Sequence, residues 1–340
     1  MMMRLVLSIL LLSGFIGCTD ASDENPDWKW EDQETEQPEV ETKDVWTDVT
    51  SEYSGLKEGI RIMKATELMD KPAVAYVAVA DMSKVDFGVW GINDPKLEGT
   101  DESFKRPSAI NNQVEAQVVI NGGFFFSSEG KNYSSSLAVS EGTVLSVNIN
   151  YASEDWVKMY YPTRAAFIED TEGKFDACWT YYRTGGNHYM YSIPAENSWE
   201  KSPQKTPSAI YPEKAKDFAA VNAIGGGPVL INRGKVVDTY VEELFNGSGG
   251  IGPDTNQPRT AVGAMEDGRL VFFVCEGRQM TEGVYGLTTG EVAQVLADLG
   301  CTEAINLDGG GSSCMLVGGK ATIKVSDGSQ RAVASAIYLK

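Results

Sequence analysis

Histidine is almost absent from this chain of 340 residues, in which His188 is the only copy. A Ser-His-Asp triad or a histidine-ligated metal site would depend wholly on that residue. His188 lies in a glycine-rich segment typical of a loop, so we predict a structural or surface role for it. Chemistry in this chain must then rest mainly on carboxylates, arginines, amides and backbone N–H groups.

Positive charge is also scarce. The chain has 29 lysines and arginines against 48 aspartates and glutamates, a net charge of −19. Nucleic-acid binding needs a basic face that contacts phosphates, so we expect no nucleic-acid partner. Much of the excess lies between Thr19 and Asp48, where 12 residues are acidic and two are basic. This stretch has no apolar periodicity, and we predict that residues 19–51 form an acidic, disordered tether.

A long hydrophobic run is lacking too, since the apolar stretch Leu5–Ile16 is short for a membrane span. It ends in Phe15-Ile16-Gly17-Cys18, which resembles a bacterial lipoprotein cleavage box. We therefore predict a lipoprotein signal peptide at 1–18, lipidation of Cys18, and attachment of the protein to a membrane through this N-terminal lipid. The location would be the cell envelope of a Gram-negative-type bacterium, periplasmic or on the outer surface. Ordinary cleavage with release is the alternative.

Only four other cysteines are present, and no two of them have the spacing of a zinc or redox site. Disulfides and buried free thiols both remain open for Cys178, Cys275, Cys301 and Cys314. The hydrophobic content of 42% is sufficient for a core that needs no such bridge.

Residues 52–340 read as one catalytic domain with many short strands. Ala73–Ala80 and Leu270–Cys275 are continuous apolar runs typical of buried strands, whereas Tyr151–Pro212 is aromatic and loop-rich, with strands expected near Val157–Ile168. A helix is clearest after Thr288, which stands in a capping-box relation to Glu291. We predict an α+β fold, with a mixed, largely antiparallel sheet core packed by a few helices.

Glycine, by contrast, is abundant and clustered beside the expected strands. Consecutive glycines occur where φ is positive or where a ligand meets the backbone. Tight turns are the favoured reading of Gly247–Gly252. For Asp308–Ser313 we favour a functional turn, because an acid and two hydroxyls flank N–H groups that can bind an anion.

Two arginine motifs accompany these turns. Arg259 opens an apolar strand, and Glu276-Gly277-Arg278 directly follows another. Arginine suits a bidentate grip on phosphate or carboxylate, although an exposed surface role fits the residue types as well.

Taken in order, these clusters resemble the motifs of the phosphodiester glycosidase family. The matching segments run from Val74 to the C-terminus and include Val119–Phe125, Gly225–Leu230, Arg259–Gly263, Glu276–Arg278, Asn306–Ser313 and Arg331–Ala334. Phe126 departs from the pattern, because an acidic residue is expected there. The resemblance implies a hydrolase that cleaves the glycosidic bond of a carbohydrate phosphodiester, a sugar-1-phosphodiester, releasing a sugar and a phosphomonoester.

The same resemblance suggests roles within the site. The expected catalytic residues are Asp308, Glu276 and Arg259. The expected substrate-binding residues are Asn121, Gly122, Gly226, Gly227, Thr260, Arg278, Gly309, Gly310, Gly311 and Ser312. No cofactor is required, but a divalent metal shared by Asp308 and Glu276 is left open.

These assignments make a geometric prediction: Asn121, Arg259, Glu276 and Asp308 should surround one cleft. Two other functions stay open. One is a surface lipoprotein that binds glycans through Tyr151–Trp199 without catalysis, and the other is a hydrolase of a different cell-envelope phosphodiester.

Overall fold

The computed structural model describes residues 45–93, 103–247 and 250–340. The predicted signal peptide, Cys18 and tether residues 19–44 lie outside this part of the chain. Residues 45–51, placed in the tether by the sequence analysis, contribute to the fold: β1 (Thr47–Asp48) pairs with β2 (Ile60–Leu68), and Trp46 packs against the apolar core. Among the residues described, no helix is long and apolar enough to cross a membrane.

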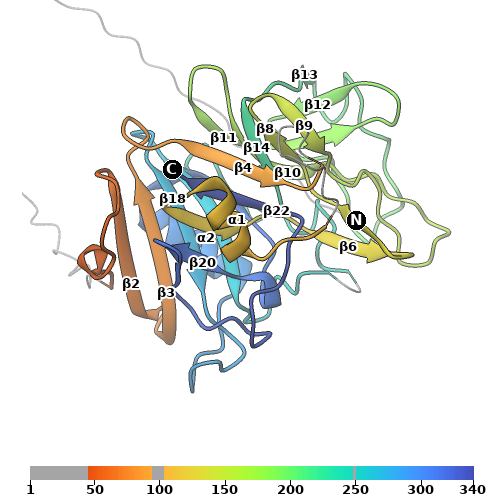
Figure 1. Cartoon of the computed structure of the whole chain (residues 1–340). Helices are drawn as coiled ribbons and strands as arrows, with labels where there is room; N and C mark the ends of the chain where they lie inside the picture. Colours follow the sequence, from red (N-terminus) through yellow and green to blue (C-terminus); the bar gives the residue numbers. More distant parts are fainter. Residues whose placement is uncertain (1–44, 94–102, 248–249) are drawn as a thin grey trace, which may run out of the picture. The chain divides into compact units, whose positions relative to one another are not determined.

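Three antiparallel sheets make up most of the fold (Figure 1). The eight-stranded sheet has the order β1, β2, β3 (Lys71–Ala80), β18 (Leu270–Cys275), β17 (Arg259–Met265), β19 (Cys301–Asn306), β15 (Val229–Asn232) and β16 (Lys235–Val236). The seven-stranded sheet has the order β13 (Lys216–Asp217), β12 (His188–Tyr191), β11 (Phe175–Tyr182), β10 (Arg164–Glu169), β14 (Asn222–Gly225), β8 (Ala138–Ser140) and β9 (Thr143–Ser146).

The five-stranded sheet has the order β21 (Lys320–Ala321), β20 (Met315–Val317), β5 (Val118–Asn121), β22 (Ser335–Leu339) and β4 (Phe87–Gly91). A separate hairpin joins β6 (Phe125–Ser128) to β7 (Lys131–Ser134). The α-helices are α1 (Pro107–Val114) and α2 (Thr289–Asp298), and short 3-10 turns lie at Thr50–Glu52 and Gly310–Ser312.

A single apolar core joins the three large sheets. It contains Phe272 of β18, Ile120 of β5 and Phe167 of β10, all fully buried. The neighbouring residues Val271 and Phe273 point to the other face of the eight-stranded sheet and pack with α2. Burial on both faces explains why Leu270–Cys275 is apolar throughout, and its predicted strand is confirmed as β18.

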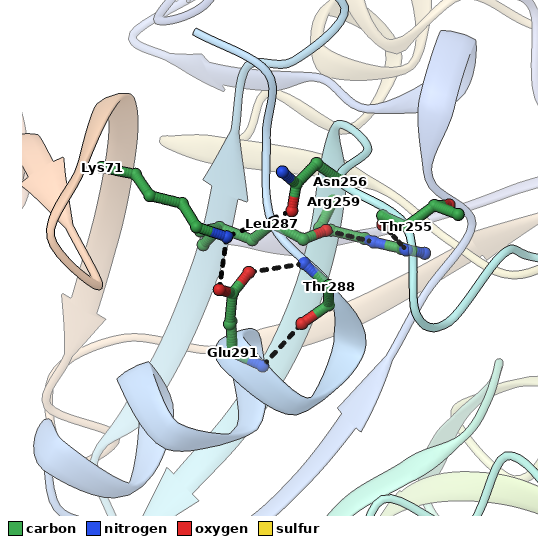
Figure 2. A network of polar contacts seen from close by, with 7 residues as sticks. All are labelled: Lys71, Thr255, Asn256, Arg259, Leu287, Thr288 and Glu291. Atoms are coloured by element: carbon green, nitrogen blue, oxygen red, sulfur yellow. Dashed lines mark hydrogen bonds and ion pairs between the residues drawn. The ribbon is translucent and has the colours of Figure 1, made fainter.

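Helix α2 begins as the sequence predicts. The Thr288 hydroxyl accepts a hydrogen bond from the Glu291 N–H, and the Glu291 carboxylate accepts one from the Thr288 N–H (Figure 2). The same carboxylate pairs with the ammonium of Lys71 at 2.5 Å, which ties the start of the helix to β3.

The predicted α+β class is wrong, because the fold is mainly β. In the described ranges only α1 and α2 are α-helices, of eight and ten residues. The sheets cover one another's apolar faces around the shared core, so little surface remains for helices to cover. The segment expected to be loop-rich supplies β11 and β12, whose aromatic side chains are largely buried against the rest of the sheet.

Candidate active site

The strand registers bring five chain segments to one edge of the fold. Arg259 at the start of β17 pairs with Cys275 at the end of β18, and Ala261 pairs with Asn306 at the end of β19. In the five-stranded sheet, the end of β5 lies beside the start of β22. Because antiparallel neighbours begin where their partners end, the loops after β5, β18 and β19 meet the segments before β17 and β22.

A cleft of about 390 Å³ lies where these loops meet. Its lining includes one carboxyl group and three guanidinium groups, together with polar and glycine backbone. The lining residues are Phe124, Gly250, Ile251, Gly252, Gln257, Arg259, Arg278, Asp308, Gly309, Gly310, Gly311 and Arg331. Six of the residues predicted from the sequence are therefore in this cleft, namely Arg259, Arg278, Asp308, Gly309, Gly310 and Gly311.

Asp308 is the carboxyl group of the cleft. The residue is half-buried, and the withdrawal of its carboxyl group from water raises its pKa to about 6. Hydrogen bonds from the Ser312 hydroxyl and the Gly309 N–H, and the charge of Arg331, act in the opposite direction. The backbone N–H of Asp308 donates to the Gly122 carbonyl at 3.0 Å. The turn Asn121-Gly122-Gly123 after β5 therefore fixes the position of Asp308.

Arg278 and Arg331 place two exposed guanidinium groups at the three-glycine turn. Arg278 donates from Nε to the Gln257 side chain at 3.0 Å. Arg331 pairs with Asp327 at 2.5 Å and donates from Nη1 to the Ser312 hydroxyl at 3.3 Å. A Cβ atom at Gly311 would overlap the Arg331 guanidinium and the Asp327 carboxylate, so glycine is what lets this ion pair lie against the turn.

Arg331 was not among the predicted site residues. The only sequence signal for it was its place in the Arg331-Ala332-Val333-Ala334 segment. The ion pair with Asp327 and the contact with Ser312 depend on the folded turn, which no residue pattern displays.

Arg259 lines the cleft, but most of its hydrogen bonds are internal. Its Nε donates to the Leu287 carbonyl, Nη1 to that of Ile251, and Nη2 to those of Gly252 and Thr255, at 2.6 to 3.1 Å (Figure 2 shows Leu287 and Thr255). The residue is 1% exposed. The guanidinium therefore holds the Gly250–Thr255 loop against the sheet. The first three residues of this loop belong to Gly247–Gly252, which was predicted as tight turns, and they line the cleft.

Asn121 and Thr260 lie behind the cleft and not in its lining. The Asn121 amide donates to the Asp308 carbonyl at 2.7 Å, and its oxygen accepts from the Thr260 hydroxyl and the Cys314 N–H. Both Asn121 and Thr260 are fully buried. They connect the loop after β19 to β5 and β17, which keeps Asp308 at the sheet edge.

Glu276 is also absent from the cleft lining. It is buried, and its Oε1 accepts a hydrogen bond from the Lys324 N–H at 2.8 Å. The segment that begins at Lys324 carries Ser326 and Asp327, the partners of Arg278 and Arg331. Of the four residues predicted to surround one cleft, Arg259 and Asp308 line it. Asn121 and Glu276 do not, because both are buried behind it and contact the backbone of segments near the cleft.

The remaining predicted residues lie around the turn or at the sheet junctions. Gly122 accepts from the Asp308 N–H, Gly227 donates to the Asn306 carbonyl at 2.7 Å, and Ser312 bonds to Asp308 and Arg331. Gly226 lies so close to the Asn306 carbonyl that any Cβ would overlap it. Gly226 also lines a second cavity, which has a volume of about 270 Å³.

The single histidine and the four described cysteines do not line the cleft. His188 is stacked on Phe218 with ring centroids 4.0 Å apart, outside the cleft, and burial lowers its pKa to about 4. Cys178, Cys275, Cys301 and Cys314 are free, buried thiols. Within residues 45–93, 103–247 and 250–340, no three His, Cys, Asp or Glu side chains are grouped as metal ligands.

A carboxyl group with a raised pKa and two exposed guanidinium groups thus line one cleft at the edge of antiparallel sheets, an arrangement suited to binding an anionic ligand. The model of the phosphodiester glycosidase family matches residues 114–340, more than half of the chain. The chain belongs to the phosphodiester glycosidase family.

Two solved structures have a similar fold. The catalytic domain of zebrafish N-acetylglucosamine-1-phosphodiester alpha-N-acetylglucosaminidase, auto-inhibited by its pro-peptide, is 18% identical with a TM-score of 0.54, over 88% of this chain and 84% of that one. A hypothetical protein from Synechocystis is 18% identical with a TM-score of 0.53, over 83% of this chain and 62% of that one.

One curated relative also matches in part. The SPbeta prophage-derived uncharacterized protein YomE of Bacillus subtilis (strain 168) is 37% identical over 86 residues. The match spans 25% of this chain and only 13% of the relative.

Proposed function

We propose that this protein hydrolyses the glycosidic bond of a sugar-1-phosphodiester and releases the free sugar and a phosphomonoester. The observation that carries the proposal is that Asp308, Arg278 and Arg331 line one cleft around the Gly309–Gly311 turn. Family membership supports a substrate with a phosphodiester-linked sugar.

The two exposed arginines suit the leaving group. When the bond between the anomeric carbon and the phosphate oxygen breaks, its electron pair leaves with a phosphomonoester, which is already a stable anion. Such a leaving group needs charge stabilisation more than it needs a strong general acid. Arg278 and Arg331 can each present two N–H groups to phosphate oxygens, and the N–H groups of the glycine turn add further donors.

Asp308 suits the activation of the attacking water and the stabilisation of charge on the sugar. Above about pH 6 its carboxyl group is ionised. In the proposed step, a water oxygen bonds to the anomeric carbon while Asp308 accepts the water proton as general base. The ionised carboxylate also stabilises the positive charge that develops on the sugar ring in the transition state.

We further propose that Asn121, Arg259 and Glu276 are positioning residues. Asn121 holds the Asp308 backbone, Arg259 holds the Gly250–Thr255 loop, and Glu276 holds the segment that supplies Ser326 and Asp327. This division of roles replaces the direct catalytic roles expected for Arg259 and Glu276 from the sequence.

The experiment is a hydrolysis assay of the purified protein on a panel of sugar-1-phosphodiesters that differ in sugar and anomer. We expect at least one member to yield free sugar and phosphomonoester, and Asp308→Asn to lower that turnover strongly without unfolding the protein. Binding of the panel with no turnover would instead support a glycan-binding protein. Release of a sugar 1-phosphate would support hydrolysis of the other ester bond.

A further inference from the structure

A second cavity opens beside the cleft. It encloses about 270 Å³, room for a single sugar ring, and shares Phe124, Gly250 and Ile251 with the cleft wall. The two spaces are therefore neighbours that share part of their walls. Of the substrate-binding residues predicted from the sequence, Gly226 lines this cavity.

Arg164 lines the second cavity and is poorly satisfied there. It opens β10, is 8% exposed, and donates from Nη1 to the Glu243 carbonyl. Its Nε has no hydrogen-bond partner, and none of the described carboxylates forms an ion pair with it. A buried guanidinium with unused donors is costly unless a ligand satisfies it.

The nearest buried acid does not fill this role. The Glu243 carboxylate accepts hydrogen bonds from the Ala165 and Val229 N–H groups, the Trp179 indole and the Thr239 hydroxyl, at 2.7 to 3.2 Å. Burial also raises the pKa of Glu243 to about 7, which disfavours the negative charge that would compensate Arg164. The positive charge of Arg164 is therefore only partly compensated within the protein.

The rest of the lining suits a sugar ring. The rings of Phe124 and Phe245 have centroids 5.3 Å apart, and both line the cavity. Aromatic faces bind the apolar faces of sugar rings, and the Arg164 guanidinium lies over the Phe245 ring at 4.4 Å from its centroid. Ser135, which is half-buried, also lines the cavity.

We propose that this cavity binds an oxyanion carried by the sugar of the substrate, a carboxylate or a phosphate, with the Arg164 guanidinium as its partner. This inference rests on the proposed function, and it narrows the substrate to sugar-1-phosphodiesters whose sugar is itself anionic. The cleft arginines then bind the scissile phosphate, while Arg164 selects the sugar.

The first test is binding to the full chain of three probes that differ only at carbon 6: glucose, glucuronic acid and glucose 6-phosphate. We expect at least one anionic sugar to bind ten-fold or more tightly than glucose, by calorimetry or ligand-observed NMR. Arg164→Gln should reduce that preference to less than two-fold. Arg183→Gln, which removes an exposed arginine outside both cavities, should keep it.

The probe whose binding depends on Arg164 identifies the oxyanion as a carboxylate or a phosphate. Equal binding of all three probes, or a preference that survives in folded Arg164→Gln, would overturn the proposal. Arg164-dependent binding without hydrolysis of any phosphodiester would refute the proposed function and leave this subsite standing. Hydrolysis of a phosphodiester without Arg164-dependent binding would support the proposed function and refute the subsite.

A second pair of variants tests the site without altering Arg164. Ser135→Asp and Ser135→Asn add side chains of nearly the same shape, and only the aspartate adds negative charge. We expect Ser135→Asp to bind the anionic probe that the unaltered protein prefers at least ten-fold more weakly than Ser135→Asn does, with equal binding of glucose by the two. If both variants weakened binding of the anionic probe equally, an oxyanion site would be contradicted. This outcome would be decisive even if Arg164→Gln did not fold.

Discussion

Asp308 holds its proton more tightly than an ordinary aspartate, because its carboxyl group is withdrawn from water. The Ser312 hydroxyl, the Gly309 N–H and the charge of Arg331 offset only part of this effect. A pKa of about 6 leaves the carboxylate mostly ionised at neutral pH, yet basic enough to accept a proton from water.

We predict that kcat/KM rises with pH through an acid limb at about pH 6. Asp308→Asn should lower kcat by a factor on the order of 10² to 10⁴, since it removes the general base, and the residual rate should lose this limb. A pH series of initial rates for both proteins is the measurement. An acid limb that is unchanged in Asp308→Asn would show that another group accepts the proton.

Arg259 and Arg278 have the same side chain but different surroundings, and this predicts opposite phenotypes. Arg259→Met leaves four backbone carbonyls without their charged donor, so we expect the free energy of unfolding to fall by about 2–4 kcal/mol. Arg278 is exposed, and Arg278→Met should change it by less than about 0.5 kcal/mol while turnover falls.

Chemical denaturation and steady-state kinetics of both variants separate the two roles. A fully stable Arg259→Met variant with lost turnover would restore the direct catalytic role that the sequence suggested for Arg259.

Residue patterns revealed some of these groups and not others. Asp308, which lines the cleft, could be predicted as a site residue because acid, glycines and hydroxyls are adjacent in the chain and their local chemistry is visible in the sequence. Arg164 and Glu243 are flanked by no such motif, and their burial results from contacts between distant segments. The sequence could not predict a positioning role for Arg259 either. Its hydrogen-bond acceptors are backbone carbonyls, which every residue has, so no side-chain pattern marks them.

At the scale of elements, the glycine turn after β19 carries the site. Gly311 faces the flexible ends of Arg331 and Asp327, whereas Gly226 faces the rigid backbone carbonyl of Asn306. The same change should therefore affect different properties at the two positions. We expect Gly311→Ala to displace the ion pair and raise KM with little loss of stability, and Gly226→Ala to destabilise the fold.

Thermal unfolding and KM for the two alanine variants test this expectation. If Gly311→Ala left KM unchanged, Arg331 would have no part in binding substrate.

Strand positions were more predictable than strand neighbours. Apolar runs predicted β3 and β18, and the capping box predicted α2, because each signal is local. The pairing of β18 with β3, which are separated by almost two hundred residues, is decided by the register of side chains across the sheet. The strands β11 and β12 were missed because their aromatic side chains suggested a loop-rich segment, while tertiary packing buries them.

Across the molecule, several carboxyl groups are buried, and burial disfavours their ionised form. Burial is the largest cause that raises the pKa of Asp238 and Asp308 to about 6 and of Glu243 and Glu303 to about 7. Their contribution to stability is complete at low pH and is lost as pH rises through these values. Burial lowers the pKa of His188 to about 4, so His188 has the opposite effect, but only below about pH 6.5.

We therefore predict that the free energy of unfolding falls between pH 6.5 and pH 8, with Glu243 alone contributing on the order of 1 kcal/mol. Denaturant titrations at the two pH values are the measurement, and Glu243→Gln should show a smaller difference between them. Constant or rising stability across this range would mean that these acids are solvated in the folded state.

The shared core of three sheets also explains why the fold class was wrong. Many short strands were expected, but the sequence does not show that the sheets bury their apolar faces against each other. The organisation matters for function, because the cleft forms only where loops from the eight-stranded and five-stranded sheets meet.

The central claim is that water attacks the anomeric carbon, and hydrolysis of a sugar-1-phosphodiester in water enriched in oxygen-18 tests it most directly. Cleavage of the glycosidic bond places the label in the released sugar, and mass spectrometry should find the phosphomonoester unlabelled. Oxygen-18 in the phosphomonoester would mean that water attacks phosphorus, and the roles proposed for Asp308, Arg278 and Arg331 would be contradicted.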